Sequence, residues 1–184
     1  MIKKIFGWLG DALLNMLDDE PASKGHEVSP QLVEMIKHFE GFRKHPYRCS
    51  AGVWTIGYGT TTYPNGKQVT LSDKNIGEEY AEKLLISKLR QHFVPVVNDY
   101  VKKPLKQHEF DALVSFVYNI GAEAFAKSTL LRKLNGSFHK DVVAEEFLRW
   151  NKARNPESGE LEPLEGLTIR RKAEAELYKT GRYP

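Results

Sequence analysis

Residues 53–72 form the stretch of this chain whose pattern is typical of β structure. "VWTIGYGTT" alternates β-branched or aromatic residues with Gly and Thr, "YPNG" is a turn sequence, and "KQVTL" follows it. This order predicts a short β-hairpin. A chain of 184 residues with one hairpin near its start must build most of its core from helices.

The segments after Ser72 carry apolar residues at helical spacing. The helices are expected at residues 76–101, 106–121, 127–135, 140–153 and 167–181, with a loop at residues 155–166. The first of them should bend or break near Pro95, because a proline removes a backbone hydrogen bond. We therefore predict an α+β fold that is predominantly α. A small lobe with the hairpin spans residues 29–72, and a helical lobe spans residues 73–184.

A helix is also expected just before the hairpin. Ser29 is a good N-cap, Pro30 suits the first helical position, and Gly41 is the expected stop. Glu40 then lies on the last turn, where a negative charge opposes the helix dipole. An acid in a locally unfavourable position needs a compensating reason, so Glu40 is a candidate functional residue.

The first 28 residues differ from the rest of the chain. Residues 1–19 place apolar and charged side chains on opposite faces of a helix, and residues 20–28 are polar, with Pro and Gly. We predict an amphipathic helix followed by a linker. Three interpretations stay open for this helix: packing on its own domain, contact with an outer membrane or another anionic surface, and export as a signal peptide.

Charge and cysteine content narrow the class of protein. Residues 1–28 hold three Lys or Arg and five Asp or Glu, so a total of +3 leaves +5 on the remainder. That mild basicity suits an anionic substrate and gives no reason to expect nucleic acid as a partner. A single cysteine excludes an internal disulfide, and no metal-binding spacing is present. We expect a monomer made in the cytoplasm, with no metal and no organic cofactor.

Four blocks of sequence occur in the order found in a known family. Glu40, Cys49 and Thr55 give the spacing E-x8-C-x5-T, and Thr55 opens "TIGYGTT"; the later blocks are "FDALVSFVYNIG", "FAKSTLLRKLN" and "GLTIRRKAEAELY". Over about residues 29–184 the chain resembles the phage-type lysozymes, the endolysins of glycoside hydrolase family 24, which are related to the lysozyme of phage T4. In that family an Asp, or in a subset a Cys, stands at the position of Cys49.

The resemblance implies roles for these three residues. Glu40 would be the general acid that protonates the glycosidic oxygen, and Thr55 would hold the attacking water. A free thiol has a pKa of ~8.5, so Cys49 replaces a carboxylate by a group that is mostly neutral at pH 7. Cys49 could be a tuned thiolate base, a nucleophile or a small polar neighbour of the water. A base gives inversion at the anomeric carbon, and a nucleophile gives retention.

The resemblance also implies a supporting set. Arg170 would pair with Glu40; a cation favours the ionised carboxylate, so burial must oppose it in a proton donor. The sugar groove would be lined by Thr61, Tyr118, Asn119 and Ser128. Tyr118 could stack on a sugar face, and it could equally be a core residue at helical spacing.

Family membership would make the protein an N-acetylmuramidase that cleaves the β-1,4 bond between N-acetylmuramic acid and N-acetylglucosamine in peptidoglycan. It would wait in the host cytoplasm until a holin opens the inner membrane, and then cause lysis. Two alternatives remain. One is a lytic transglycosylase, which needs a single Glu and no placed water. The other is a wall-binding or membrane-active protein on a catalytically dead lysozyme scaffold.

Overall fold

The computed structural model of the chain describes residues 25–49, 51–155 and 158–184. The predicted helix at residues 1–19 and most of the predicted linker lie outside the described residues. The described elements, in chain order, are α2 (Pro30–Glu40), β1 (Arg43–Arg48), β2 (Trp54–Gly57), α3 (Glu78–Lys88), the π-helical turn η1 (Leu89–Phe93), α4 (Val94–Tyr100), α5 (Gln107–Ile120), α6 (Ala122–Ala126), α7 (Thr129–Asn135), α8 (Lys140–Leu148), β3 (Lys152–Arg154), β4 (Leu161–Pro163) and α9 (Glu165–Thr180).

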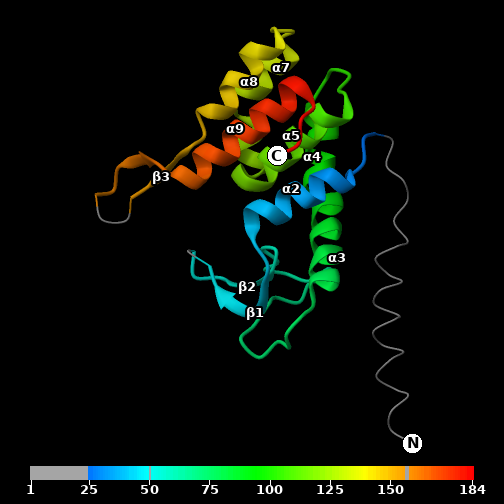
Figure 1. Ribbon diagram of the computed structural model, residues 1–184, viewed down its shortest axis with the longest axis vertical. Helices are drawn as coiled ribbons and strands as arrows, with labels where there is room; N and C mark the ends of the chain where they lie inside the picture. The colour runs from blue at the N-terminus through cyan, green and yellow to red at the C-terminus, as the bar shows by residue number, and fades with distance from the viewer. Residues whose placement is uncertain (1–24, 50, 156–157) are drawn as a thin grey trace, which may run out of the picture.

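These elements form two parts of unequal size. Figure 1 shows the β1–β2 hairpin set apart from a body of helices, with α3 extending from the hairpin towards that body. Helix α2 leads from the body into the hairpin. Its last residue, Glu40, lies just before the chain enters β1. Two small antiparallel strand pairs and a majority of helix confirm the predicted α+β class.

Helix α5 is the centre of the core. Eight consecutive residues, Phe110 to Val117, are buried, and a helix buried around its circumference must be surrounded by other elements. Helix α9 packs along it, and α8 packs on α9. The ring of Phe116 contacts the rings of Phe125, Phe147 and Trp150, with centroids 4.9 to 6.4 Å apart. This packing fixes α9, which carries Arg170, against the rest of the body.

Helix α2 begins and ends where the sequence predicts. The Ser29 hydroxyl accepts a hydrogen bond from the Leu32 amide at 3.0 Å, and Pro30 occupies the first turn. Gly41 ends the helix with φ +67°, a conformation that glycine adopts without strain. Glu40 is therefore the last helical residue, next to the turn into β1.

The predicted pairing across "YPNG" is present but shorter than expected: the Tyr63 amide donates to the Lys67 carbonyl, and the Val69 amide donates to the Thr61 carbonyl. Strand β2 pairs with the preceding β1, not with the segment after "YPNG". That later segment contributes one isolated bridge, between Thr62 and Gln68. The strand ends at Gly57 because Gly57 and Gly59 both take positive φ values, which turn the chain sharply between Ile56 and Thr60.

The long α-helix is interrupted near Pro95, as predicted. It widens into the π-helical turn η1, and Pro95 then lies in the first turn of α4, where its missing N–H is not needed. One further expectation needs correction. The predicted loop over residues 155–166 instead contains strand β4, which pairs with β3 in an arm that projects from the body (Figure 1). None of the helices in the described ranges is long and apolar enough to cross a membrane.

Candidate active site

Glu40 lies between the two parts of the molecule, and its carboxyl is partly accessible. About a quarter of its side chain (24%) is exposed. Oε1 accepts a hydrogen bond from Arg170 Nη1 at 2.6 Å. Oε2 accepts no hydrogen bond within the described part of the chain. The carboxyl is thus held at one oxygen and open at the other.

Arg170 is itself fixed from three sides. Its side chain is 5% exposed, its Nε donates to Glu174 Oε1 at 3.2 Å, and its Nη2 donates to the Ser115 carbonyl at 3.3 Å. Glu174 is fully buried and also accepts hydrogen bonds from Ser115 Oγ and Arg171 Nη2. A planar guanidinium with several fixed partners keeps one orientation, so Arg170 presents Nη1 to Glu40 as a rigid donor.

Gly59 forms the wall beside the open oxygen. It has φ +86°, and a Cβ atom placed on it would lie 3.6 Å from Glu40 Oε2 and 2.8 Å from the Tyr118 hydroxyl. Only a residue without a side chain fits here. The turn therefore approaches Glu40 closely without covering Oε2 by a side chain.

Cys49 and Thr55 lie at the turn that joins β1 to β2. The pKa of the Cys49 thiol lies below its ordinary value because the backbone amides of Val53 and Ala51 and the hydroxyl of Thr55 donate hydrogen bonds to sulfur. Thr55 is 3% exposed, and its hydroxyl also donates to the Val53 carbonyl at 3.0 Å. Since a hydroxyl carries one hydrogen, Thr55 serves one of these acceptors at a time.

Tyr47 links this pair to Glu40. It is the cross-strand partner of Thr55 and lies two residues before Cys49. Burial raises the pKa of its phenol, the negative charge of Glu40 raises it further, and Arg43 opposes the rise. Tyr47 is therefore within electrostatic range of both Glu40 and Cys49.

Comparison with known proteins agrees with this geometry. The family described as Phage lysozyme matches residues 37–174, a range that includes Glu40, Cys49, Thr55 and Arg170. The chain belongs to the phage lysozyme family. It is accordingly a glycoside hydrolase of the lysozyme type.

Three members of the wider group illustrate the likeness. An endolysin of Acyrthosiphon pisum secondary endosymbiont phage 1 is 40% identical over 153 residues, which cover 83% of this chain and 98% of that one. The solved endolysin of Escherichia coli O157:H7 phage FAHEc1 superposes with a TM-score of 0.80 at 38% identity, covering 89% of this chain and 99% of that chain. The muramidase domain of SpmX from Asticaccaulis excentricus gives a TM-score of 0.74 at 36% identity, over 85% and 99%.

The four residues predicted to line the sugar groove lie in different surroundings. Tyr118 is near Glu40, but its ring already contacts Phe93, and its hydroxyl donates to the Tyr58 carbonyl at 2.9 Å. Thr61 is half-buried and follows the turn that flanks Glu40. Their roles as sugar contacts stay predictions.

Asn119 and Ser128 are engaged elsewhere. Asn119 is exposed, and its Oδ1 accepts a hydrogen bond from Arg171 Nη1 at 3.0 Å. Ser128 is 5% exposed and caps α7, because its hydroxyl accepts a hydrogen bond from the Leu131 amide at 3.0 Å. Among the described residues, no contact joins Ser128 to Glu40. The structure thus groups Tyr118 with the acid and sets Ser128 apart from it.

Several residues that lie around Glu40 in the structure were not predicted from the sequence. Tyr47 and Gly59 stand within the quoted motif, and the alternating glycines of "TIGYG" are the signal that marks a close backbone approach. Glu174 is four residues after Arg170, a spacing that allows a helical ion pair.

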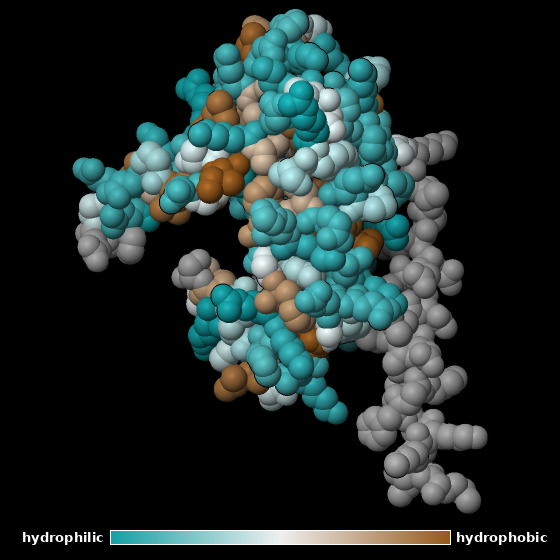
Figure 2. All heavy atoms as spheres, viewed as in Figure 1, coloured by the Kyte–Doolittle hydropathy of each residue, from teal (hydrophilic) through white to brown (hydrophobic). Residues whose placement is uncertain are grey.

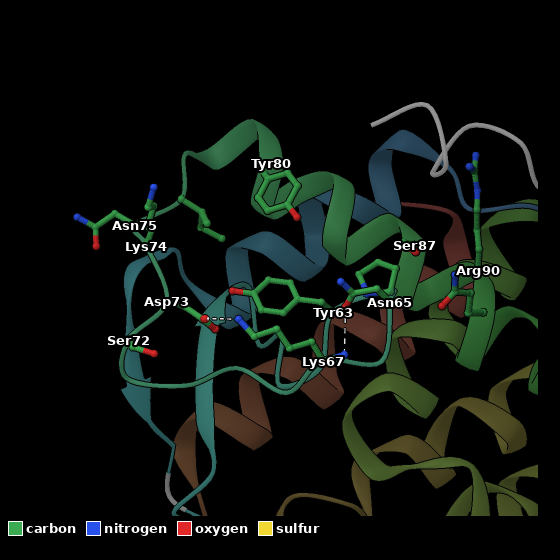
Figure 3. A pocket seen from close by; sticks show the side chains of 13 residues that line it. Tyr63, Asn65, Lys67, Ser72, Asp73, Lys74, Asn75, Tyr80, Ser87 and Arg90 are labelled. Carbon is green, nitrogen blue, oxygen red and sulfur yellow. Dashed lines mark hydrogen bonds and ion pairs between the residues drawn. The ribbon is translucent and has the colours of Figure 1, made fainter. Parts of the chain in front are cut away.

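A separate cavity of about 620 Å³ lies on another face of the small lobe. Figure 3 shows its lining, which comes from the segment around Tyr63, Lys67 and Asp73 and from α3 and η1, including Tyr80 and Arg90. None of the predicted catalytic residues lines it, so it is distinct from the cleft at Glu40.

The space-filling view in Figure 2 shows a hollow between the hairpin and the helical body, next to the projecting β3–β4 arm.

Proposed function

We propose that this enzyme hydrolyses the β-1,4 bond between N-acetylmuramic acid and N-acetylglucosamine in peptidoglycan, with Glu40 as the general acid. The observation that carries the proposal is the asymmetry of the Glu40 carboxyl, bound by Arg170 at Oε1 and unbonded at Oε2. A proton on Oε2 can reach a glycosidic oxygen in the cleft, and the anchored Oε1 keeps the carboxyl from rotating.

The second half of the reaction falls to the hairpin. Thr55 and Cys49 hold a water on the side of the sugar opposite Glu40. As the glycosidic bond breaks and the leaving oxygen takes the proton of Glu40, that water attacks the anomeric carbon and gives its own proton to the Cys49 thiolate. This sequence inverts the anomeric centre. The hydrogen bonds to sulfur support it, because they favour the thiolate that a base requires.

The biological setting follows from the chemistry. The enzyme acts as an endolysin: it is held in the host cytoplasm until the inner membrane opens, and then degrades the peptidoglycan of the periplasm as a monomer. The net charge of +5 outside residues 1–28 supports attraction to the anionic wall.

A turbidity assay on chloroform-treated bacteria tests the proposal. The wild-type enzyme should clear the suspension, and Glu40→Gln, which keeps the shape but has no acidic proton, should not. Clearing by Glu40→Gln at the wild-type rate means that glycosidic cleavage is not the mechanism, and it favours a membrane-active or wall-binding scaffold instead.

Product analysis separates the remaining alternatives. Hydrolysis adds one water to the fragments, whereas a lytic transglycosylase leaves an anhydro sugar, so mass spectrometry distinguishes them by the mass of one water. NMR of the fresh product reports its anomeric configuration. Inversion is expected for Cys49 as base, and retention means that Cys49 is a nucleophile.

A further inference from the structure

Lys88 is a half-buried cation near the catalytic acid. It is the last residue of α3 and has no carboxylate partner among the described residues. Burial lowers the pKa of its amino group, and the negative charge of Glu40 opposes that effect, so the two groups are within electrostatic range. Removing a cation from water without an ion pair is unfavourable. An interaction other than an ion pair must hold Lys88 there.

That interaction is a hydrogen bond to the small lobe. Lys88 Nζ donates to the Gly59 carbonyl at 2.8 Å, and the Tyr118 hydroxyl donates to the neighbouring Tyr58 carbonyl at 2.9 Å. Nζ also lies 5.0 Å from the centroid of the Tyr118 ring. Two consecutive carbonyls of one turn are thus held by two side chains from the helical body, one from α3 and one from α5.

The π-helical turn η1 supports this arrangement. It begins at the residue after Lys88, and π-helical turns occur often at functional sites. At its far end, Phe93 packs on Tyr118 with ring centroids 5.1 Å apart. Lys88 and Phe93 therefore contact the same ring from the two ends of η1, and Tyr118 is fixed in place for its bond to Tyr58.

The turn that these side chains hold is the wall beside Glu40. A Cβ on Gly59 would lie 3.6 Å from Glu40 Oε2, the oxygen that we assign to proton transfer. A small displacement of the turn would close this gap or widen it, and a misplacement of about 1 Å can reduce an enzyme's rate about 100-fold.

We propose that Lys88 is a positioning residue of the catalytic acid, which acts by clamping the Tyr58–Gly59 turn, together with Tyr118, against the helical body. This inference rests on the proposed role of Glu40. Lys88 touches the wall and not the reacting atoms. Its loss should therefore reduce kcat and leave KM nearly unchanged, because the sugar groove stays in place.

The test compares Lys88→Met with Lys88→Arg and Lys83→Met. Methionine keeps the length of the side chain and removes its donors, whereas arginine keeps a cationic donor. Lys83 is on the same helix, and its one ion pair within the described ranges is with Glu79 at the surface, at 3.3 Å, so Lys83→Met is a matched control. The measurement is kcat and KM on purified soluble glycan strands of peptidoglycan, with circular dichroism melting for each variant.

Lys88→Met should lower kcat by about 10-fold to 100-fold, because a displacement of the turn by up to about 1 Å has a cost of this order. Its KM should stay within about 3-fold of wild type, because the change affects the position of Glu40 in the transition state and not the binding of the sugar. Lys88→Arg should recover a large part of kcat, and Lys83→Met should match wild type. If Lys88→Met does not fold, Tyr118→Phe is the second variant, because it removes the hydrogen bond to the Tyr58 carbonyl. It should likewise lower kcat and leave KM nearly unchanged.

Three results would overturn the inference. The first is wild-type kcat in Lys88→Met. The second is equal loss in Lys88→Met and Lys88→Arg, which would mean that the donor is irrelevant. The third is a rise in KM that accounts for the whole effect. A parallel Glu40→Gln variant separates the two proposals: if it is inactive while Lys88→Met is fully active, only the inference about Lys88 fails, and if it is active, both fail.

Discussion

Arg170 binds Glu40 through a single carboxylate oxygen, at 2.6 Å, across 130 positions of the chain. Arg170 is on α9, the last described helix, and Glu40 is on α2, the first. The two helices come together because both pack on α5 at the centre of the core. The same guanidinium donates to Glu174 and to the Ser115 carbonyl. In the proposed reaction, the carboxylate that forms when Glu40 gives up its proton already has a fixed cation beside it, so little reorganisation is needed.

Replacing Arg170 should therefore reduce both stability and activity. Arg170→Met leaves the buried Glu174 with one cation fewer, and breaking a buried ion pair costs about 3 kcal/mol or more. Arg170→Lys keeps the charge but cannot make three bonds in the geometry of a guanidinium, so it should fold better and remain slow. Urea unfolding and initial rates on soluble glycan strands measure the two effects.

Arg149→Met is the control for Arg170. Arg149 is 73% exposed and lies 3.6 Å from Glu146, so its removal should change stability by less than about 0.5 kcal/mol. If Arg170→Met proved as stable and as active as Arg149→Met, the ion pair with Glu40 would have no part in the mechanism.

The parts of this site that local sequence rules describe were predictable. The ends of α2 and the position of Glu40 follow from local rules, because Ser29 caps the helix with its hydroxyl, Pro30 fits the first turn and Gly41 adopts a positive φ. The family resemblance implied that Cys49 and Thr55 act together, and the Thr55 hydroxyl is among the groups that lower the pKa of the Cys49 thiol.

The parts that depend on distant contacts were not predictable. Strand β1 reads as a loop because "RKHPYR" is polar and contains Pro46, and only its pairing with β2 makes it a strand. The resemblance implies a groove role for Ser128, and the structure shows that its hydroxyl also caps α7. Lys88 becomes recognisable only when α3 and the Gly59 turn are seen together, because no local rule links a helix-end lysine to a carbonyl 29 residues earlier.

Substitution of Gly59 should disturb the acid directly. In Gly59→Ala the new methyl group meets the Tyr118 hydroxyl at 2.8 Å, and the backbone is held at φ +86°. Positive φ in a non-glycine residue costs about 1–3 kcal/mol. We expect a larger loss of stability than this strain alone gives, together with reduced kcat, because Tyr118 must move away from Glu40.

Gly66→Ala is the control for Gly59→Ala, because it introduces the same backbone strain without a contact to Tyr118. Gly66 has φ +82°, and a Cβ there has nothing within 4 Å. It should show the loss of stability that backbone strain causes and keep the wild-type rate. Equal rates in the two variants, measured on soluble glycan strands, would mean that the wall beside Glu40 does not affect catalysis.

Cys49 should control how activity depends on pH. Hydrogen bonds hold the pKa of the thiol below its ordinary value, so the thiolate is present at lower pH than for a free cysteine and is lost as the pH falls through that pKa. An aspartate ionises near pH ~3.9. Cys49→Asp should thus remain active and keep its activity to lower pH than the wild-type enzyme in a profile of rate against pH.

Cys49→Ala and Cys49→Ser distinguish the three roles of the thiol. Alanine should lose much of the activity, because no base remains. Serine keeps a small polar group that does not ionise in this range, so a high rate in Cys49→Ser indicates a polar neighbour of the water. Wild-type activity in Cys49→Ala would leave Cys49 with a packing role only.

Deletion of residues 1–20 should separate the catalytic domain from the predicted amphipathic segment. The family match begins at residue 37 and the described contacts of the site begin at Glu40, so cleavage of purified peptidoglycan should stay near the wild-type rate. If the segment disturbs an outer membrane through its apolar face, the deletion should slow lysis of intact cells while leaving chloroform-treated cells equally sensitive. Rates on the two cell preparations, measured at matched enzyme concentration, test this. Equal loss on both preparations and on purified peptidoglycan would contradict a membrane role and would assign the segment to the stability of the fold.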